Sequence, residues 1–105
     1  MSKGIVQLVG VDLFFRGKID AMLLSAGYEV IAKPGGPPPD VVIADVGKVE
    51  PADVLARFPG VPVLGFGAHT DPQRLRAARQ AGFANVVPRS VFSERLPELV
   101  AELLV

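Results

Sequence analysis

Two aspartates follow apolar runs at points where their carboxylates could act together. Asp45 directly follows residues 41–44 (VVIA), and Asp12 comes just after the first apolar run of the chain. If these runs are parallel strands, both carboxylates lie near the carboxyl ends of the sheet, where open α/β sheets bind ligands and where carboxylates could hold Mg²⁺. The structural alternatives, which we favour, are simpler: Asp12 caps the following helix. Asp45 then pairs with Arg89 or Lys48, or accepts hydrogen bonds from N–H groups of its loop.

The other reactive residues lack the neighbours that catalysis would need. His69 is the only histidine and no cysteine occurs, which excludes thiolate chemistry and a histidine-rich metal site. Thr70 and Ser90 stand in no Gly-x-Ser-x-Gly motif. Residues 65–67 (GFG) lack the third glycine of a dinucleotide fingerprint, and no P-loop motif occurs. We therefore expect no enzyme activity, no bound cofactor and no dedicated metal site.

Composition narrows the class of partner. Eleven basic and eleven acidic residues cancel, so that nothing points to nucleic acid or to a membrane surface. Hydrophobic residues make up 50% of the sequence, which is enough for a core, and 105 residues fit one domain. The N-terminal residues have the pattern of neither a signal peptide nor a membrane span. We expect a single domain over residues 1–105, located in the cytoplasm.

Alternating strand and helix patterns would position the two aspartates. Short runs rich in β-branched residues predict strands at 5–11, 28–32, 41–44, 61–66 and 86–87. Helical periodicity predicts helices at 15–26, at 51–58, at 72–81 after the cap Asp71, and at the end of the chain after the cap Ser93. Gly27 is expected to end the first helix. This alternation is typical of a parallel sheet with right-handed crossovers and helices on both faces.

One connection breaks this alternation. Residues 33–40 (KPGGPPPD) are rich in proline and glycine, so that neither a helix nor a strand is expected there. Fully extended, these residues reach about 26 Å, whereas a parallel crossover needs about 20 Å. A parallel second strand is therefore feasible, and an antiparallel one stays open.

Four segments, in this order, resemble the receiver domain of bacterial response regulators. Residues 39–45 (PDVVIAD) resemble its third strand with the phosphoacceptor aspartate, and residues 62–69 (PVLGFGAH) resemble its fourth strand. Residues 77–84 (AARQAGFA) and 87–92 (VPRSVF) are similar to the turn before the fifth strand and to that strand's end. The resemblance implies a flavodoxin-like, doubly wound α/β sheet of five parallel strands in the order 2-1-3-4-5. The proline- and glycine-rich loop would replace the helix between strands 2 and 3.

The resemblance also implies that Asp45 is phosphoacceptor-like but has lost its metal ligands. Receivers carry a pair of acids after the first strand, and the matching positions here are Gly10 and Val11. Only Asp12, one place further on, is acidic. Magnesium requires oxygen ligands in octahedral geometry, which glycine and valine side chains do not supply.

Two further site positions differ from the family pattern. Gly67, followed by Ala68, stands where receivers have a threonine or serine. Arg89 stands where they have a lysine, which keeps the positive charge with a different shape. The pattern resembles a degenerate, or pseudo-receiver, site.

The resemblance implies a signalling module that acts through a protein partner, without magnesium-dependent phosphorylation. The helix at 72–81 is basic, and we expect its arginines to form part of the partner surface: Arg74, Arg76 and Arg79. By analogy with receivers, this helix, the fifth strand and the last helix could also form a homodimer.

Two alternatives stay open at this stage. The first is a working receiver that is phosphorylated on Asp45 in a phosphorelay, with Mg²⁺ held by Asp12 and Asp45. The second is a small-ligand binder that uses the crevice at the strand ends, where Gly10 and Gly67 would leave space.

Overall fold

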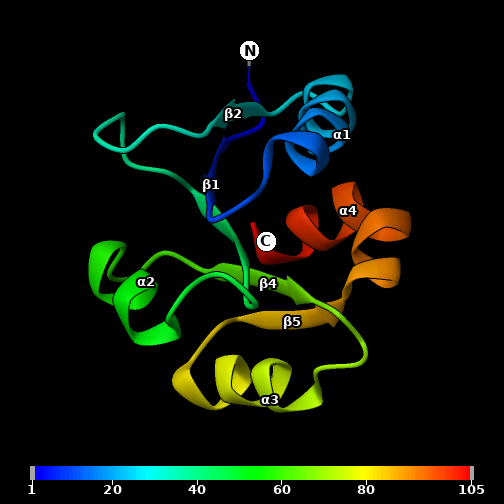
Figure 1. Ribbon diagram of the computed structural model, residues 1–105. Coiled ribbons are helices and arrows are strands. Elements are labelled where there is room, and N and C mark those ends of the chain that lie inside the picture. The colour runs from blue at the N-terminus through cyan, green and yellow to red at the C-terminus, as the bar shows by residue number, and fades with distance from the viewer. Residues whose placement is uncertain (1, 105) are drawn as a thin grey trace.

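The computed structural model describes residues 2–104, so Met1 and Val105 of the predicted domain lie outside the described part. A sheet of five parallel strands runs in the order β2-β1-β3-β4-β5, as the resemblance implies (Figure 1). Its strands are β1 (Ile5–Val9), β2 (Glu29–Ile31), β3 (Val41–Asp45), β4 (Val63–Gly67) and β5 (Asn85–Pro88). The helices within residues 2–104 are α1 (Leu13–Ser25), α2 (Pro51–Arg57), α3 (Pro72–Ala81) and α4 (Arg89–Leu103).

Helices cover both faces of this sheet. Helices α1 and α4 pack together on one face, and α2 and α3 pack together on the other (Figure 1). Val6 and Leu8 of β1 enter the core under α1 and α4, whereas Val42 and Ala44 of β3 enter the core under α2 and α3. Strands β3 and β4 are buried along their whole length, which explains their continuous apolar sequences. Among residues 2–104, no helix has both the length and the apolar character that crossing a membrane requires.

An aromatic cluster fills the core between the sheet and helices α1 and α4. The rings of Phe66 in β4 and Phe92 in α4 are stacked with their centroids 4.3 Å apart, and both side chains are fully buried. Phe15 in α1 packs against the two at 5.2 and 5.7 Å. The cluster therefore ties the first turn of α1 to α4 and to the end of β4.

Side-chain caps fix where two of the helices begin. Asp12 Oδ1 accepts a hydrogen bond of 2.9 Å from the Phe15 N–H at the start of α1. Asp71 Oδ1 accepts one of 3.3 Å from the Arg74 N–H at the start of α3. Gly27 has a φ of 97°, which is the left-handed conformation expected of the residue that ends α1. These predictions are confirmed.

The predicted cap of the last helix is wrong. Helix α4 begins at Arg89, directly after Pro88 ends β5, so that Ser93 lies inside the helix. The helix is bent at Arg95, whose φ is −118°, because Pro97 has no N–H and its ring clashes with the carbonyl of Ser93. The pattern of a serine followed by a proline marks a bend within this helix and not its beginning.

The connection from β2 to β3 passes through the proline- and glycine-rich segment. Residues 32–40, all of them described, form turns, bends and extended chain. Strand β2 pairs with β1 in parallel, with Val30 opposite Val6, which settles the direction that the sequence left open. Asp40 holds the start of β3 beside β1, because its Oδ2 accepts a hydrogen bond of 2.7 Å from the Ile5 N–H.

We predict that Phe92→Ala lowers the free energy of unfolding by about 3–5 kcal/mol, because it removes a buried ring from the aromatic cluster. Phe14→Ala is the matched control, since Phe14 is 96% exposed, and it should change the stability by less than about 0.5 kcal/mol. Urea denaturation followed by circular dichroism measures both variants. Equal losses of stability in the two variants would contradict the structure, in which Phe92 is buried and Phe14 is exposed.

Candidate functional site

Asp45 is the buried acid at the carboxyl edge of the sheet. It ends β3 and is 3% exposed. Its Oδ1 accepts a hydrogen bond of 2.9 Å from the Gly47 N–H, and its Oδ2 lies 3.4 Å from Nη2 of Arg89. A buried carboxylate is tolerated when donors and a cation compensate it, and here both oxygens have such a partner.

Arg89 is held in place by aromatic rings as well as by Asp45. It is the first residue of α4, and its guanidinium lies 5.3 Å from the ring centroid of Phe15 and 5.6 Å from that of Phe66. A guanidinium at this distance is attracted to the ring face. The cation therefore bridges Asp45 to the aromatic cluster, and we call Asp45, Gly47 and Arg89 the carboxylate clamp.

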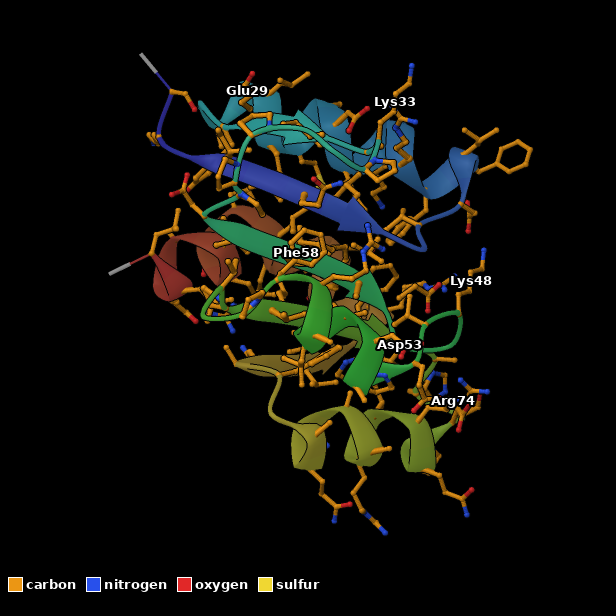
Figure 2. The ribbon with its side chains drawn as sticks, turned by 90° about the vertical axis from the view of Figure 1, so that its left-hand side faces the viewer. Glu29, Lys33, Lys48, Asp53, Phe58 and Arg74 are labelled. Carbon is orange, nitrogen blue, oxygen red and sulfur yellow. The ribbon has the colours of Figure 1, made fainter. Side chains whose placement is uncertain are left out.

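Asp12 has two partners of its own at the same edge. Besides capping α1 through Oδ1, it places Oδ2 3.5 Å from Nζ of Lys48, in the loop after β3 (Figure 2). The Phe15 N–H, and then Lys48, hold the pKa of Asp12 below its ordinary value of 3.8. Lys48, a candidate partner of Asp45 from the sequence, thus pairs with Asp12 instead.

The predicted site glycines adjoin occupied space. A Cβ on Gly10, whose φ is 71°, would lie 2.6 Å from Cγ1 of Val49. A Cβ on Gly67 would lie 2.6 Å from Cγ2 of Val46 and 3.2 Å from Cδ2 of Leu75. The expectation that these glycines open a crevice for a ligand is therefore wrong at both positions, because branched side chains from neighbouring segments fill it.

The two other predicted site residues, Val11 and Ala68, bring no polar side chain to the carboxylate clamp. Val11 is half-buried and packs against the core under α1 and α4. Ala68 is exposed directly after β4, and His69 beside it is exposed as well. None of these side chains brings an oxygen toward Asp45.

The residues present do not fit a magnesium ion. The carboxylate oxygens of Asp12 and Asp45 already face N–H groups or cationic side chains, which repel a further cation. Within residues 2–104, no group of three or more acids or histidines is placed to hold a metal. Octahedral oxygen coordination would require at least one of these ion pairs to open.

The basic surface expected on α3 is partly engaged with the protein itself. Arg74 (Figure 2) donates from Nη1 to the carbonyl of Val46 at 3.4 Å. Arg79 Nη2 donates to the carbonyl of Val86 at 3.0 Å. Arg76 is exposed on the same helix. Two of the three arginines therefore tie α3 to the residue after β3 and to β5.

Sequence reasoning missed an exposed apolar pair at the start of α1. Leu13 is 79% exposed and Phe14 is 96% exposed, directly after Asp12. A signal was present, because the helical stripe that begins at Phe15 leaves both residues off the core face.

No protein-family model matches this chain, and no curated protein matches it. Solved structures do resemble it. A response regulator from Thermotoga maritima has a TM-score of 0.78 at 18% identity, with 99% of this chain and 98% of that one covered. FixJ from B. japonicum has a TM-score of 0.84 at 19% identity, with 99% and 59% covered. CheY4 of Vibrio cholerae, a chemotaxis response regulator, has a TM-score of 0.76 at 22% identity, with 99% of each chain covered. The likeness shows that the chain has the fold of response-regulator receivers.

Introducing a hydroxyl residue at the end of β4 should destabilise the fold. We expect Gly67→Thr to lower the free energy of unfolding by about 1–3 kcal/mol, because its Cβ would overlap Val46. In a Val46→Ala background, the same substitution should lower the free energy of unfolding by at least about 1 kcal/mol less. A double-mutant cycle based on chemical denaturation measures this difference. An equal loss in both backgrounds would show that Val46 does not fill this position.

The Asp12 carboxylate, which accepts the Phe15 N–H and pairs with Lys48, is predicted to make a pH-dependent contribution to stability. Because its pKa is lowered on folding, the contribution is present above 3.8, its ordinary pKa, and is lost as the pH falls through the lowered value. Asp12→Asn keeps a cap acceptor and removes the charge, so it should lower the Tm at pH 7 and match the wild type in strong acid. Lys48→Met should reproduce part of the loss at pH 7. A Tm difference that does not depend on pH would contradict the assignment.

Proposed function

We propose that this chain is a receiver-like signalling module that acts by binding a protein partner and does not use magnesium-dependent phosphorylation of an aspartate. The observation that carries the proposal is the carboxylate clamp, in which both oxygens of Asp45 are engaged by Gly47 and Arg89. The likeness of the fold to response regulators supports a signalling role.

Phosphoryl transfer would have to work against this arrangement. Its catalysis consists mostly of positioning the phosphoryl group and neutralising its charge, which receivers achieve with a metal ion. Here Asp12 faces Lys48, and Gly10 and Val11 bring no oxygen. An attacking Asp45 oxygen would first have to leave its own hydrogen bond or ion pair, without a metal site beside it.

The surface of the chain offers a place for a partner. Leu13 and Phe14 present apolar side chains to solvent at the start of α1, at the same edge as the carboxylate clamp. Large aromatic side chains that are covered on association contribute strongly to protein interfaces. We therefore place the partner contact at this pair, with Arg76 and the face formed by α3, β5 and α4 as the surface for self-association.

The proposal predicts no phosphorylation by a small phosphodonor. After incubation with acetyl phosphate and Mg²⁺, intact-protein mass spectrometry should show no added phosphoryl group, for the wild type as for Asp45→Asn. An active receiver treated in parallel controls for the reagents. Mg²⁺ should also leave the NMR signals of the Gly47 and Asp12 amides unchanged.

An Asp45-dependent gain of mass would overturn this proposal and support a working receiver. Shifts of the Gly47 amide at low Mg²⁺ concentration would do the same, because they would show that the ion displaces Arg89 or the loop N–H.

A further inference from the structure

A pocket lies on the face of the sheet that carries α2, away from the carboxylate clamp. Figure 2 looks onto this face, with Phe58 labelled in front of the sheet. The pocket has a volume of about 290 Å³, which is close to the lower end of the usual range for small-molecule sites. The proline- and glycine-rich loop and the residues after α2 form its walls, and β1 contributes the residue Gln7.

Gln7 is buried in a strand that is otherwise apolar. It is 3% exposed, and its Nε2 donates to the carbonyls of Lys33 at 3.2 Å and Leu8 at 3.4 Å. Because both neighbours are carbonyl oxygens, the NH₂ group must face them and Oε1 must face the other way. Within residues 2–104, no side-chain or backbone donor is hydrogen-bonded to this Oε1.

The prolines in the walls of the pocket cannot donate to this oxygen. Four of the lining residues are prolines, which have no N–H to donate: Pro37, Pro38, Pro39 and Pro59. Their rings and that of Phe58 instead offer apolar faces, which suit a flat aromatic body. Within residues 2–104, this oxygen is not among the buried side-chain atoms that lack a partner, so it reaches solvent at the pocket. A donor that enters the pocket replaces that solvent with a hydrogen bond of fixed geometry that the protein does not supply.

Arg57 adds a positive charge to the same pocket. It ends α2, and its guanidinium lies 5.1 Å from the ring centroid of Phe58. It takes part in none of the salt bridges formed within residues 2–104. A guanidinium held on an aromatic ring is well placed to meet a carboxylate.

We propose that this pocket binds a small aromatic carboxylic acid that carries a ring N–H, of about the size of an indole derivative. The N–H donates to Gln7 Oε1, the ring lies among the prolines and Phe58, and the carboxylate meets Arg57. This site shares no residue with the carboxylate clamp, so it stands independently of the proposed signalling mechanism.

Indole-3-acetate is a direct probe, because the chain has no tryptophan and the fluorescence of the indole ring can be followed without interference. Two comparison ligands separate the contacts. 1-Naphthaleneacetate keeps the carboxylate and lacks the N–H, and indole keeps the N–H and lacks the carboxylate. The wild type should bind indole-3-acetate about three- to tenfold more tightly than either, which corresponds to one hydrogen bond or ion pair.

Variants assign each preference to its residue. Gln7→Met keeps the length of the side chain and removes the acceptor, so it should abolish the preference for indole-3-acetate over 1-naphthaleneacetate. Arg57→Gln should abolish the preference for indole-3-acetate over indole. Gln73→Met, an equivalent change on the exposed side of α3, should alter neither.

The ligand comparison on the wild type keeps the proposal testable even if Gln7→Met does not fold. Amide NMR shifts should map the bound probe to the lining residues that carry an N–H: Gln7, Gly35, Gly36, Arg57, Phe58 and Val61. The proposal is overturned if indole-3-acetate does not bind at millimolar concentration, if the wild type shows no preference among the three ligands, or if the shifts lie elsewhere.

Discussion

The buried carboxylate of Asp45 constrains the arrangement of the whole carboxyl edge of the sheet. A charge that is taken out of water is tolerated only when cations and hydrogen-bond donors compensate it. Gly47 supplies an N–H and Arg89 a guanidinium, and Arg89 itself lies over the rings of Phe15 and Phe66. The compensation of one charge therefore links β3, β4, α1 and α4. Electrostatics and aromatic packing depend on each other here, because the cation that neutralises Asp45 is also held by the core.

The positions beside Asp45 are closely packed. Val46 follows Asp45 directly, is 2% exposed, and fills the space that a side chain at Gly67 would need. Val49 fills the corresponding space beside Gly10. Because protein interiors are close-packed, the branched side chains of the loop after β3 fit only when the residues at the strand ends are small. A change on one side alone would leave a clash or a cavity, so the loop after β3 and the glycines that face it are packed together.

Features that depend on local spacing could be predicted from the sequence, whereas features that depend on distant contacts could not. The cap at Asp12 and the turn at Gly27 follow from a few adjacent residues, and both are confirmed. The strand order followed from the resemblance, and the parallel sheet from the alternation of elements. The partner of Asp45 stayed open, because Arg89 is 44 residues away and Lys48 is nearby in sequence. Only the folded chain shows that Lys48 turns to Asp12 and leaves Asp45 to Arg89.

A polar residue inside an apolar strand marks a position that packing alone does not explain. Gln7 and Asp45 are the buried polar residues of the described chain, and they lie on neighbouring strands. The protein compensates Asp45 at both oxygens, so its burial requires nothing from outside. It compensates Gln7 only at the amide nitrogen, beside prolines that have no N–H. The amide nitrogen ties β1 to the carbonyl of Lys33, whereas the oxygen, which is not among the buried unpartnered atoms of residues 2–104, is left to solvent or to a ligand in the pocket. Solvent bonds to this oxygen weakly, whereas a ligand N–H of fixed geometry bonds to it selectively. This difference makes the half-satisfied amide of Gln7 a recognition element.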